Sequence, residues 1–224
     1  MIYVMSDLHG MYDKYIEMLK KINFNKNDKL YILGDVVDRG DKSIPLLRYI
    51  MNQKNVEMIM GNHEDMMLKS CIDSNRVYHS CWMSNGGVSI LQQLENLRIS
   101  DQHEILNYLK ERPLYKIVDK YILVHAGLLA IPLENININD YMNQQDSEYL
   151  LWERNDLVYN PIPSDHILSD YTIIFGHTPT VYLNGIKPMQ IFKKDNLIGI
   201  DCGSCFKGGR LACLRLDDMK EFYV

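Results

Sequence analysis

Six polar side chains that can bind metal ions follow short apolar runs of this chain: Asp7, His9, Asp35, Asn62, His125 and His177. A single histidine beside a strand is more often a hydrogen-bonded structural residue than a ligand. Together, however, carboxylate, amide and imidazole donors suit Mn²⁺, Fe or Zn²⁺ better than Ca²⁺. Six donors exceed what one catalytic metal with an open position needs, so they indicate two metals that share a carboxylate. Two metals ~3.5–4 Å apart can activate water and polarise a phosphoryl oxygen.

The apolar runs themselves predict the strands that would position these donors. Residues 2–5, 30–33 and 56–60 are strand-like, and they alternate with helical patterns over 12–22 and 44–51. This β-α-β-α-β order predicts parallel strands with right-handed connections. Each strand ends in a polar loop that contains glycine, so the donors should meet at the sheet edge where open α/β sheets bind ligands.

The second half of the chain predicts a further sheet. We expect helices over 82–94 and 102–112, a hairpin of 114–118 with 121–125, and a mostly irregular segment over 132–163. Short β-like runs follow at 171–175, 181–186, 197–200 and 211–216. With no internal repeat or long linker, we expect one domain over residues 1–224.

Composition limits the kinds of partner. The 224 residues carry a net charge of −5, which gives no basic footprint for nucleic acid. No apolar run approaches the ~18 residues of a membrane span. The five cysteines are odd in number and follow no secretory signal, so free thiols in a cytoplasmic protein are expected.

Five motifs in order carry a resemblance to a known family. They are Asp7-Leu8-His9-Gly10, Gly34-Asp35-Val36-Val37-Asp38-Arg39-Gly40, Gly61-Asn62-His63-Glu64, His125-Ala126-Gly127 and Gly176-His177-Thr178. The series resembles that of the phosphoprotein phosphatase family of metallophosphoesterases, most of all its compact bacterial branch, typified by bacteriophage lambda protein phosphatase. The resemblance implies an α/β fold in which two mixed β-sheets pack as a sandwich flanked by helices, the calcineurin-like metallophosphoesterase fold.

The same resemblance implies a dinuclear metal site. Asp35 would bridge two divalent ions, Mn²⁺ by family expectation, although Fe or Zn²⁺ also fit the ligand types. The remaining ligands would divide into Asp7 and His9 on one ion and Asn62, His125 and His177 on the other.

It also implies how a phosphate ester would be bound and cleaved. His63 would be the general acid, oriented by Asp38, which would not itself be a ligand. Arg39 and Arg154 would clamp the phosphoryl group, with Asn62 also in contact with substrate. Independently of the family, guanidinium groups match phosphate oxygens bidentately, and a carboxylate-held His can donate a proton near neutral pH. The simpler alternatives are a surface Asp38–Arg39 pair and an Arg154 that only packs beside Trp152.

Three functions remain open at this point. The leading prediction is a serine/threonine protein phosphatase that hydrolyses phosphorylated proteins or small phosphate esters through in-line attack of a metal-bound hydroxide. The alternative is hydrolysis of a dinucleoside polyphosphate, as in diadenosine tetraphosphatases, by the same metal centre. A non-catalytic phosphate-binding protein is the third, and the intact ligand set argues against it. The native metal, the substrate and the oligomeric state are left open.

The chain departs from the family pattern at three positions. Ser6 stands where many members have Gly, and Met60 replaces an Arg that often precedes Gly-Asn-His-Glu. Cys202 replaces Thr in the late Asp-Thr-Gly turn. Its spacing to Cys205 also fits a redox or zinc pair, but a lone pair is weak support, and small buried residues that fill a turn are the simpler alternative.

Overall fold

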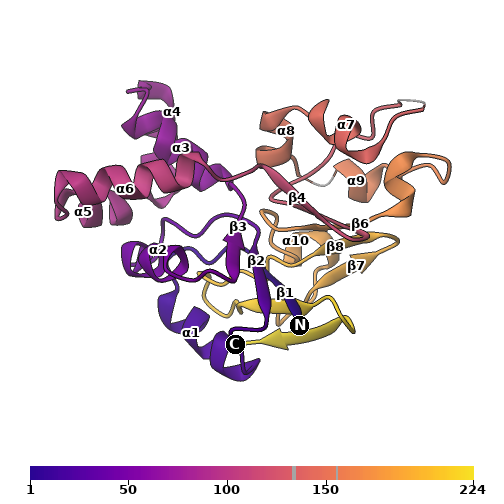
Figure 1. The fold of residues 1–224 in the computed structure, drawn as a ribbon, viewed down its shortest axis with the longest axis horizontal. Helices are drawn as coiled ribbons and strands as arrows, with labels where there is room; N and C mark the ends of the chain where they lie inside the picture. The colour runs from indigo at the N-terminus through magenta and orange to yellow at the C-terminus, as the bar shows by residue number, and fades with distance from the viewer. Residues whose placement is uncertain (133–134, 155) are drawn as a thin grey trace.

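The fold is described from a computed structural model that covers residues 1–132, 135–154 and 156–224. Within these residues ten strands form two five-stranded sheets (Figure 1). The first sheet has the order β10 (Lys220–Tyr223), β9 (Ala212–Arg215), β1 (Ile2–Met5), β2 (Lys29–Ile32) and β3 (Val56–Met58). The second has the order β4 (Tyr115–Val118), β5 (Tyr121–Val124), β6 (Thr172–Phe175), β8 (Leu197–Gly199) and β7 (Phe192–Lys194).

Both sheets contain three neighbouring parallel strands that antiparallel strands extend, at one edge of the first sheet and at both edges of the second. β1, β2 and β3 are parallel, as are β5, β6 and β8. β9 and β10 extend the first sheet in antiparallel fashion, and β4 and β7 do so at the two edges of the second. The predicted β-α-β-α-β unit and the two mixed sheets are therefore confirmed.

Helices cover the outer faces of the sheets (Figure 1). Those of the first half are α1 (Tyr12–Lys21), α2 (Ser43–Met51), α3 (Asn62–Cys71), α4 (Arg76–Trp82), the π-helical turn η1 (Met83–Gly87), α5 (Val88–Glu95) and α6 (Ile99–Lys110). The second half contributes α7 (Ile138–Asn143), α8 (Ser147–Trp152), α9 (Asp156–Tyr159), the 3₁₀ turn η2 (Ile167–Asp170) and α10 (Val181–Asn184).

Alternation along the strands divides the core into three layers. Val4 of β1 and Leu123 of β5 share the cluster between the sheets. Tyr3 packs in the cluster that holds α1 and α2, whereas Ile122 and Val124 pack in the cluster that holds α7 and α8. Because successive strand residues face opposite sides, both faces of each sheet are buried, which gives the expected sandwich flanked by helices.

Several predicted elements were wrong in detail. Residues 181–186 are not a strand, because the chain forms α10 and stops at Gly185, whose φ of 69° and N–H bond to the Val181 carbonyl close the turn. The segment 132–163 is less irregular than expected, since Asn137 and Asp146 cap α7 and α8 with their side chains. Leu133, Glu134 and Asn155 of that segment lie outside the described residues.

The sequence did not predict two of the strands, and the predicted range of a third extends beyond its observed end. β7 and β10 are half polar and pair at sheet edges, so they lack a continuous apolar signal. β3 ends at Met58, because the N–H of Met60 turns to the carbonyl of Pro113. That residues 1–224 form one domain stays a prediction.

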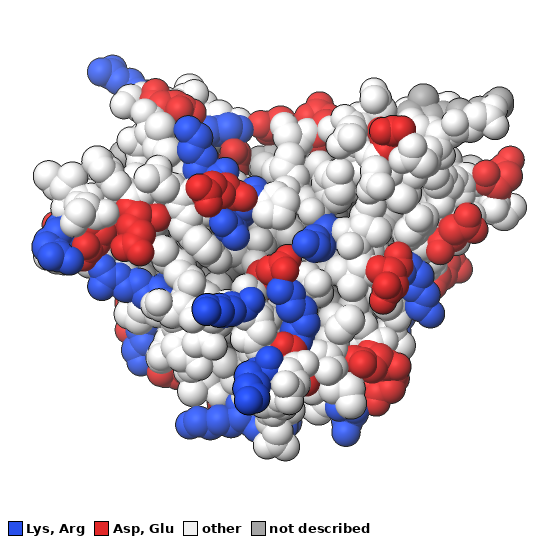
Figure 2. All heavy atoms as spheres, in the orientation of Figure 1, with Lys and Arg blue, Asp and Glu red and all other residues white. Residues whose placement is uncertain are grey.

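On the face shown in Figure 2, Lys and Arg side chains lie among Asp and Glu side chains. In the described part of the chain, no helix combines the length and apolarity needed to cross a membrane.

The layered core predicts a graded response to truncation. Leu123 is fully buried between the sheets, so Leu123→Ala should lower the free energy of unfolding by about 2–5 kcal/mol through lost burial and a residual cavity. Val77, which is 77% exposed on α4, is the control, and Val77→Ala should change it by less than about 0.5 kcal/mol. Urea denaturation measures both; equal effects would contradict the assigned layers.

Candidate functional site

The ten residues that the sequence predicts for the site form one continuous series of contacts. They lie on the loops that follow β1, β2, β5 and β6, at the start of α3 and on the segment after α8. The links, each 3.8 Å or less, run from Arg154 through His177, Asn62, His125, Asp35 and His63 to Arg39, with Asp7 joined to His177, His9 to Asp35 and Asp38 to His63. The structure therefore brings all of them together.

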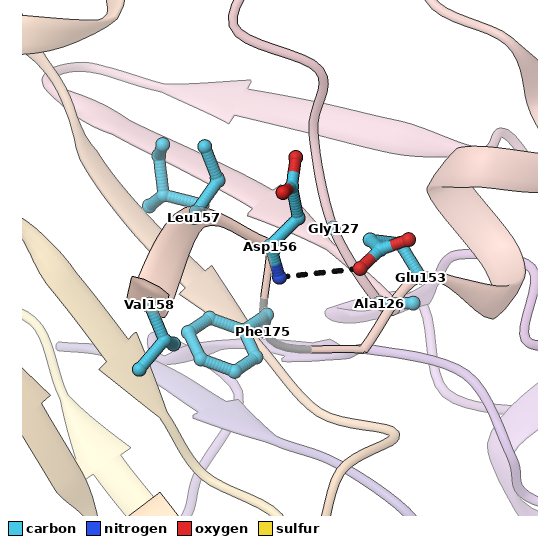
Figure 3. A pocket seen from close by; sticks show the side chains of 8 residues that line it. Ala126, Gly127, Glu153, Asp156, Leu157, Val158 and Phe175 are labelled. Carbon is cyan, nitrogen blue, oxygen red and sulfur yellow. Dashed lines mark hydrogen bonds between the residues drawn. The ribbon is translucent and has the colours of Figure 1, made fainter. Parts of the chain in front are cut away.

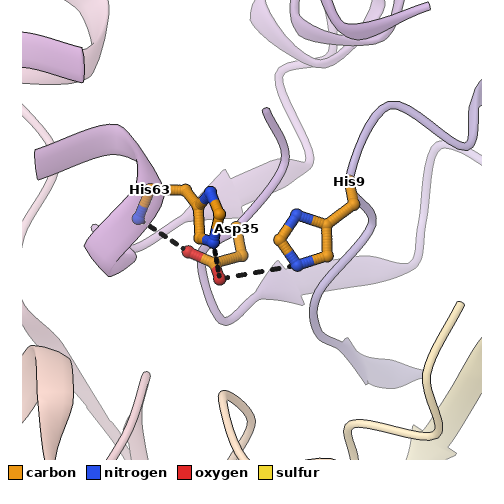
Figure 4. Close-up of side chains that lie close together, drawn as sticks. All are labelled: His9, Asp35 and His63. Carbon is orange, nitrogen blue, oxygen red and sulfur yellow. Dashed lines mark hydrogen bonds and ion pairs between the residues drawn. The ribbon is translucent and has the colours of Figure 1, made fainter. Parts of the chain in front are cut away.

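Asp35 lies at the centre of this series (Figure 4). Its Oδ2 is 3.6 Å from Nε2 of His9 and 3.8 Å from Nε2 of His63. Its Oδ1 is 3.4 Å from Nε2 of His125 and accepts the N–H of His63 at 3.0 Å. One carboxylate thus faces donors on both sides, as a bridging ligand requires.

The second group of donors surrounds the side-chain oxygen of Asn62. His125 Nε2 lies 2.9 Å and His177 Nδ1 lies 3.1 Å from this oxygen. Asp7 joins this group of donors through His177, because its Oδ2 accepts the N–H of His177 at 3.0 Å and the hydroxyl of Ser6. Asp7 therefore adjoins His177, while the predicted division of ligands between two ions stays a prediction.

His63 is held by a buried acceptor. Its Nδ1 lies 2.5 Å from Oδ2 of Asp38, and Asp38 also accepts the indole N–H of Trp82 at 2.9 Å. All three side chains are buried. This arrangement fixes the ring and leaves Nε2 facing Arg39, whose guanidinium lies 3.1 Å away.

Two exposed arginines stand at the ends of the series. Arg39 contacts His63, lies 3.6 Å from the sulfur of Cys205 and stacks near the ring of Phe206 at 5.7 Å. Arg154 donates to the carbonyl of His177 at 3.1 Å. Neither guanidinium pairs with a carboxylate among the described residues, so both keep donors that can reach an anion.

Many of these residues have left-handed backbone conformations. The φ angles of Asp7, His9, Asp35, Asp38 and His177 lie between 43° and 70°. Such conformations cost about 1–3 kcal/mol each when the residue is not glycine, and they cluster at functional sites. Here they let the backbone turn sharply at the end of each strand, so that the side chains point back toward one another.

The electrostatics of the site favour a bound cation. Burial, then the charge of Asp201, raises the pKa of Asp7 well above its usual value. Burial, then Asp7, does the same to the pKa of Asp35. Burial alone raises the pKa of Asp201 to about 6, against the opposing effect of its hydrogen bond from Gly203. These carboxyls lack a positive partner strong enough to ionise them, a role that divalent ions can take.

The histidines are likewise suited to metal ligation. Burial lowers the pKa of His125 to about 3 and that of His9 well below its usual value, so both rings are neutral. His9 and His125 donate from Nδ1 to backbone carbonyls at 3.0 and 2.6 Å, which leaves each Nε2 free as a ligand. Nε2 of His177 is buried without a hydrogen-bond partner among the described residues.

Within the described part of the chain, two groups of three side chains are close enough to hold an ion, with ligand atoms within 4.8 Å of one another: His9, Asp35 and His63, and Asp35, His125 and His177. Both contain Asp35. The donor types, the free Nε2 atoms and the raised pKa values of the carboxyls all fit divalent cations.

Sequence reasoning missed two supporting residues and one acid. Trp82 received no role, although its indole N–H donates to Asp38. Glu64 received no role, although its carboxylate is fully buried and accepts four backbone N–H groups. A glutamate at the third helical position after a glycine cap is the signal that could have found it. Asp201, buried near Asp7, was noted only for its turn.

The unusual cysteines do not form a separate site. Cys202 is buried, with its sulfur 3.8 Å from the hydroxyl of Thr180, and Cys205 contacts Arg39. Among the described residues, neither group able to hold an ion includes a cysteine. This agrees with small residues that fill a turn. Ser6, the change from Gly, instead donates to Asp7.

A small cavity of about 10 Å³ lies behind the loop that carries His125 (Figure 3). Ala126 and Gly127 line one side, and Glu153 and Asp156 line the other, where the N–H of Asp156 donates to Glu153 at 3.1 Å. A cavity of this size has room for about one water molecule.

Curated relatives were compared with the whole chain. A symmetrical bis(5'-nucleosyl)-tetraphosphatase of Nitrosomonas europaea is 36% identical over 57% of this chain and 44% of its own length. Enzymes of the same name from Wigglesworthia glossinidia brevipalpis and Buchnera aphidicola are each 25% identical, over 98–99% of this chain and 96–98% of their own lengths. The Wigglesworthia alignment extends over 284 positions, so that relative contains segments that this 224-residue chain lacks.

Solved structures with low identity share the fold. One, described provisionally as a diadenosine tetraphosphatase, has a TM-score of 0.69 at 17% identity and covers 100% of this chain and 92% of its own. A serine/threonine phosphatase of Saccharomyces cerevisiae has a TM-score of 0.63 at 18% identity, over 100% and 78%.

The profile of the family described as Calcineurin-like phosphoesterase matches residues 1–198, which include all ten residues of the site. With the two-sheet fold and the ligand-rich strand ends, this match shows that the chain belongs to the calcineurin-like phosphoesterase family of metallophosphoesterases.

Proposed function

We propose that this protein hydrolyses dinucleoside polyphosphates at a centre of two divalent metal ions. The observation that carries the proposal is the continuous row of ten residues, with a bridging carboxylate at its centre and an exposed arginine at each end. When bound, two such ions activate a water molecule and neutralise charge on the phosphoryl oxygens. The ligands proposed for them are Asp7, His9, Asp35, Asn62, His125 and His177.

The choice of substrate rests on the relatives. Two of the named tetraphosphatases align over nearly the whole chain. These names favour the alternative from the sequence over the leading prediction, a serine/threonine protein phosphatase. Phosphomonoester hydrolysis stays as the second candidate, because this chain lacks segments that the Wigglesworthia enzyme has.

The two arginines suit an extended row of phosphates. Arg39 stands beside His63, and Arg154 stands beside His177, at the other end of the contact series. Guanidinium groups bind phosphate oxygens through paired N–H donors. A chain of phosphates laid across the metal site would therefore meet one arginine on each side of the bond that breaks.

His63 is proposed to protonate the leaving oxygen. Asp38 holds Nδ1 and stabilises the doubly protonated ring, so that Nε2 can donate. Burial, then the charge of Arg39, lowers the pKa of His63 to about 3 in the substrate-free protein. An anionic phosphate that draws Arg39 away and adds negative charge would raise this pKa again. Binding of substrate thereby prepares its own proton donor.

A substrate panel tests the assignment. Mn²⁺-loaded protein should turn over diadenosine tetraphosphate with a higher kcat/KM than a phosphoserine peptide or p-nitrophenyl phosphate, and should release two molecules of ADP. Anion-exchange chromatography follows the products. A higher kcat/KM for the peptide would instead favour the protein phosphatase, and failure on all three substrates would contradict both.

The roles of the two aspartates after β2 can be separated. Asp35→Asn should weaken binding of both ions, because this carboxylate faces donors on both sides. Asp38→Asn should keep the metal content and slow turnover by roughly 10²–10⁴-fold, the usual contribution of general acid catalysis. Calorimetric titration with Mn²⁺ and steady-state rates measure the two effects; equal loss of metal in both variants would refute the division.

Metal binding should depend on pH in a defined direction. The proposed ligands Asp7 and Asp35 keep their protons to higher pH than ordinary carboxyls in the metal-free fold, because burial raises their pKa values well above the usual range. Cations favour the ionised forms, so binding should release protons, and the affinity for Mn²⁺ should rise with pH until these two carboxyls are ionised in the metal-free protein as well. Calorimetry in buffers of different ionisation enthalpy counts these protons; uptake instead of release would contradict the assignment.

A further inference from the structure

Glu64 is a fully buried carboxylate in the first turn of α3. Buried carboxylates are normally paired with a cation, yet among the described residues no lysine, arginine or histidine forms an ion pair with this one. Glu64 is also not one of the predicted metal ligands. Its buried charge therefore needs another explanation.

Four backbone N–H groups supply that explanation. Oε2 accepts from Asp35 at 2.8 Å and from Gly61 at 3.0 Å, and Oε1 accepts from Val36 at 2.8 Å and Val37 at 3.2 Å. The loop after β2 leaves the sheet, so these amides need acceptors of their own. An ionised carboxylate is a strong acceptor for them. Glu64 thus joins the loop after β2 to the loop after β3.

The same peptides reach a third loop. The carbonyl of Asp35 accepts the N–H of His9 at 2.8 Å, and that of Val36 accepts the N–H of Gly10 at 2.8 Å. The peptide units of the β2 loop therefore lie between Glu64 on one side and the β1 loop on the other. One side chain holds, directly or through one peptide layer, the three loops that carry His9, Asp35 and Asn62.

The carboxylate of Asp35 is fixed from both ends as a result. Its backbone N–H is held by Glu64, and its Oδ1 accepts the N–H of His63 from the same helix turn. The left-handed φ of 53° at Asp35 is retained by these contacts. No space is left for adjustment at Gly61, where an added Cβ would lie 2.3 Å from Oδ1 of Asp35.

We propose that Glu64 is a positioning residue, which sets the geometry of the metal ligands without binding metal or substrate. The inference rests on the proposed metal site, since its effect is exerted through Asp35. Replacement by glutamine preserves shape but substitutes an N–H donor for one acceptor oxygen. At least one pair of backbone N–H groups then loses its partner.

The test compares Glu64→Gln with a matched control. Asp28 is also a buried carboxylate that accepts a backbone N–H, from Asn25 at 2.9 Å, but it lies in the turn before β2, remote from the site. Asp28 also pairs with the N-terminal amine at 3.0 Å, and the control Asp28→Asn should lower the melting temperature, as Glu64→Gln should. Only Glu64→Gln should weaken Mn²⁺ binding, by about 10–100-fold, the usual effect of a residue that orients a ligand. Calorimetry at a temperature where circular dichroism shows both variants folded measures this.

Folded Glu64→Gln with wild-type Mn²⁺ affinity would overturn the inference. If that variant does not fold, Glu64→Asp keeps the charge with one methylene fewer, and hydrogen exchange reads the amides of residues 35–37. Faster exchange together with weaker Mn²⁺ binding supports the inference, and wild-type values of both overturn it. Failure of the wild-type protein itself to bind two ions would overturn the proposed metal site, and is distinguishable because it involves no variant.

Discussion

Negative charge buried at one edge of the two sheets is the constraint on which the site depends. Asp7, Asp35, Asp38, Glu64 and Asp201 are all at most 4% exposed. Each needs stabilisation that water cannot give there. Asp38 receives it from His63 and Trp82, and Glu64 receives it from backbone amides. Asp7 and Asp35 are the ones left with strongly raised pKa values, and they are the ones that cations would serve.

This division explains how one cluster of acids can have different roles. A carboxylate that is already satisfied by fixed donors gains little from a metal ion and remains a structural or orienting group. One that faces only neutral imidazoles and another acid gains much. The role of each acid therefore follows from its neighbours, and the conformations of the loops determine which groups those neighbours are. The loops in turn hold their shape through left-handed residues and the amide contacts of Glu64.

The sequence was most informative where a residue of a metal-binding type also stands close to the end of a predicted strand. Each donor stands one to four positions beyond an apolar run, and strand ends are fixed by burial, so the site residues could be predicted together. The contacts of Glu64 and Trp82 could not be predicted from the sequence. The partners of Glu64 are backbone groups, which carry no sequence signal. The partner of Trp82 is Asp38, which lies 44 positions away in the chain. Short elements failed for a similar reason: Val181–Asn184 has β-branched and aromatic character, yet a left-handed Gly185 closes it as a helix.

The names of the relatives favour one of the substrates that the geometry of the site allows. Metal ligands, a proton donor and two arginines serve a phosphate monoester and a polyphosphate equally well, since the bond broken is the same P–O bond. What differs is the leaving group, and no residue pattern in the motifs describes it. The substrate therefore depends on surfaces around the metal site, such as the turn with Cys205 and Phe206 beside Arg39.

The layered core also restricts where the family can change length. A single residue inserted into β5 would exchange the faces of Leu123 and Val124, and so move side chains between two separate cores. The loops at the site are equally closed to insertion, because their peptides are shared among three strand ends. Extra segments such as those of the longer Wigglesworthia relative are therefore expected in connections that touch neither, and chain length can vary there without disturbing the metal ligands.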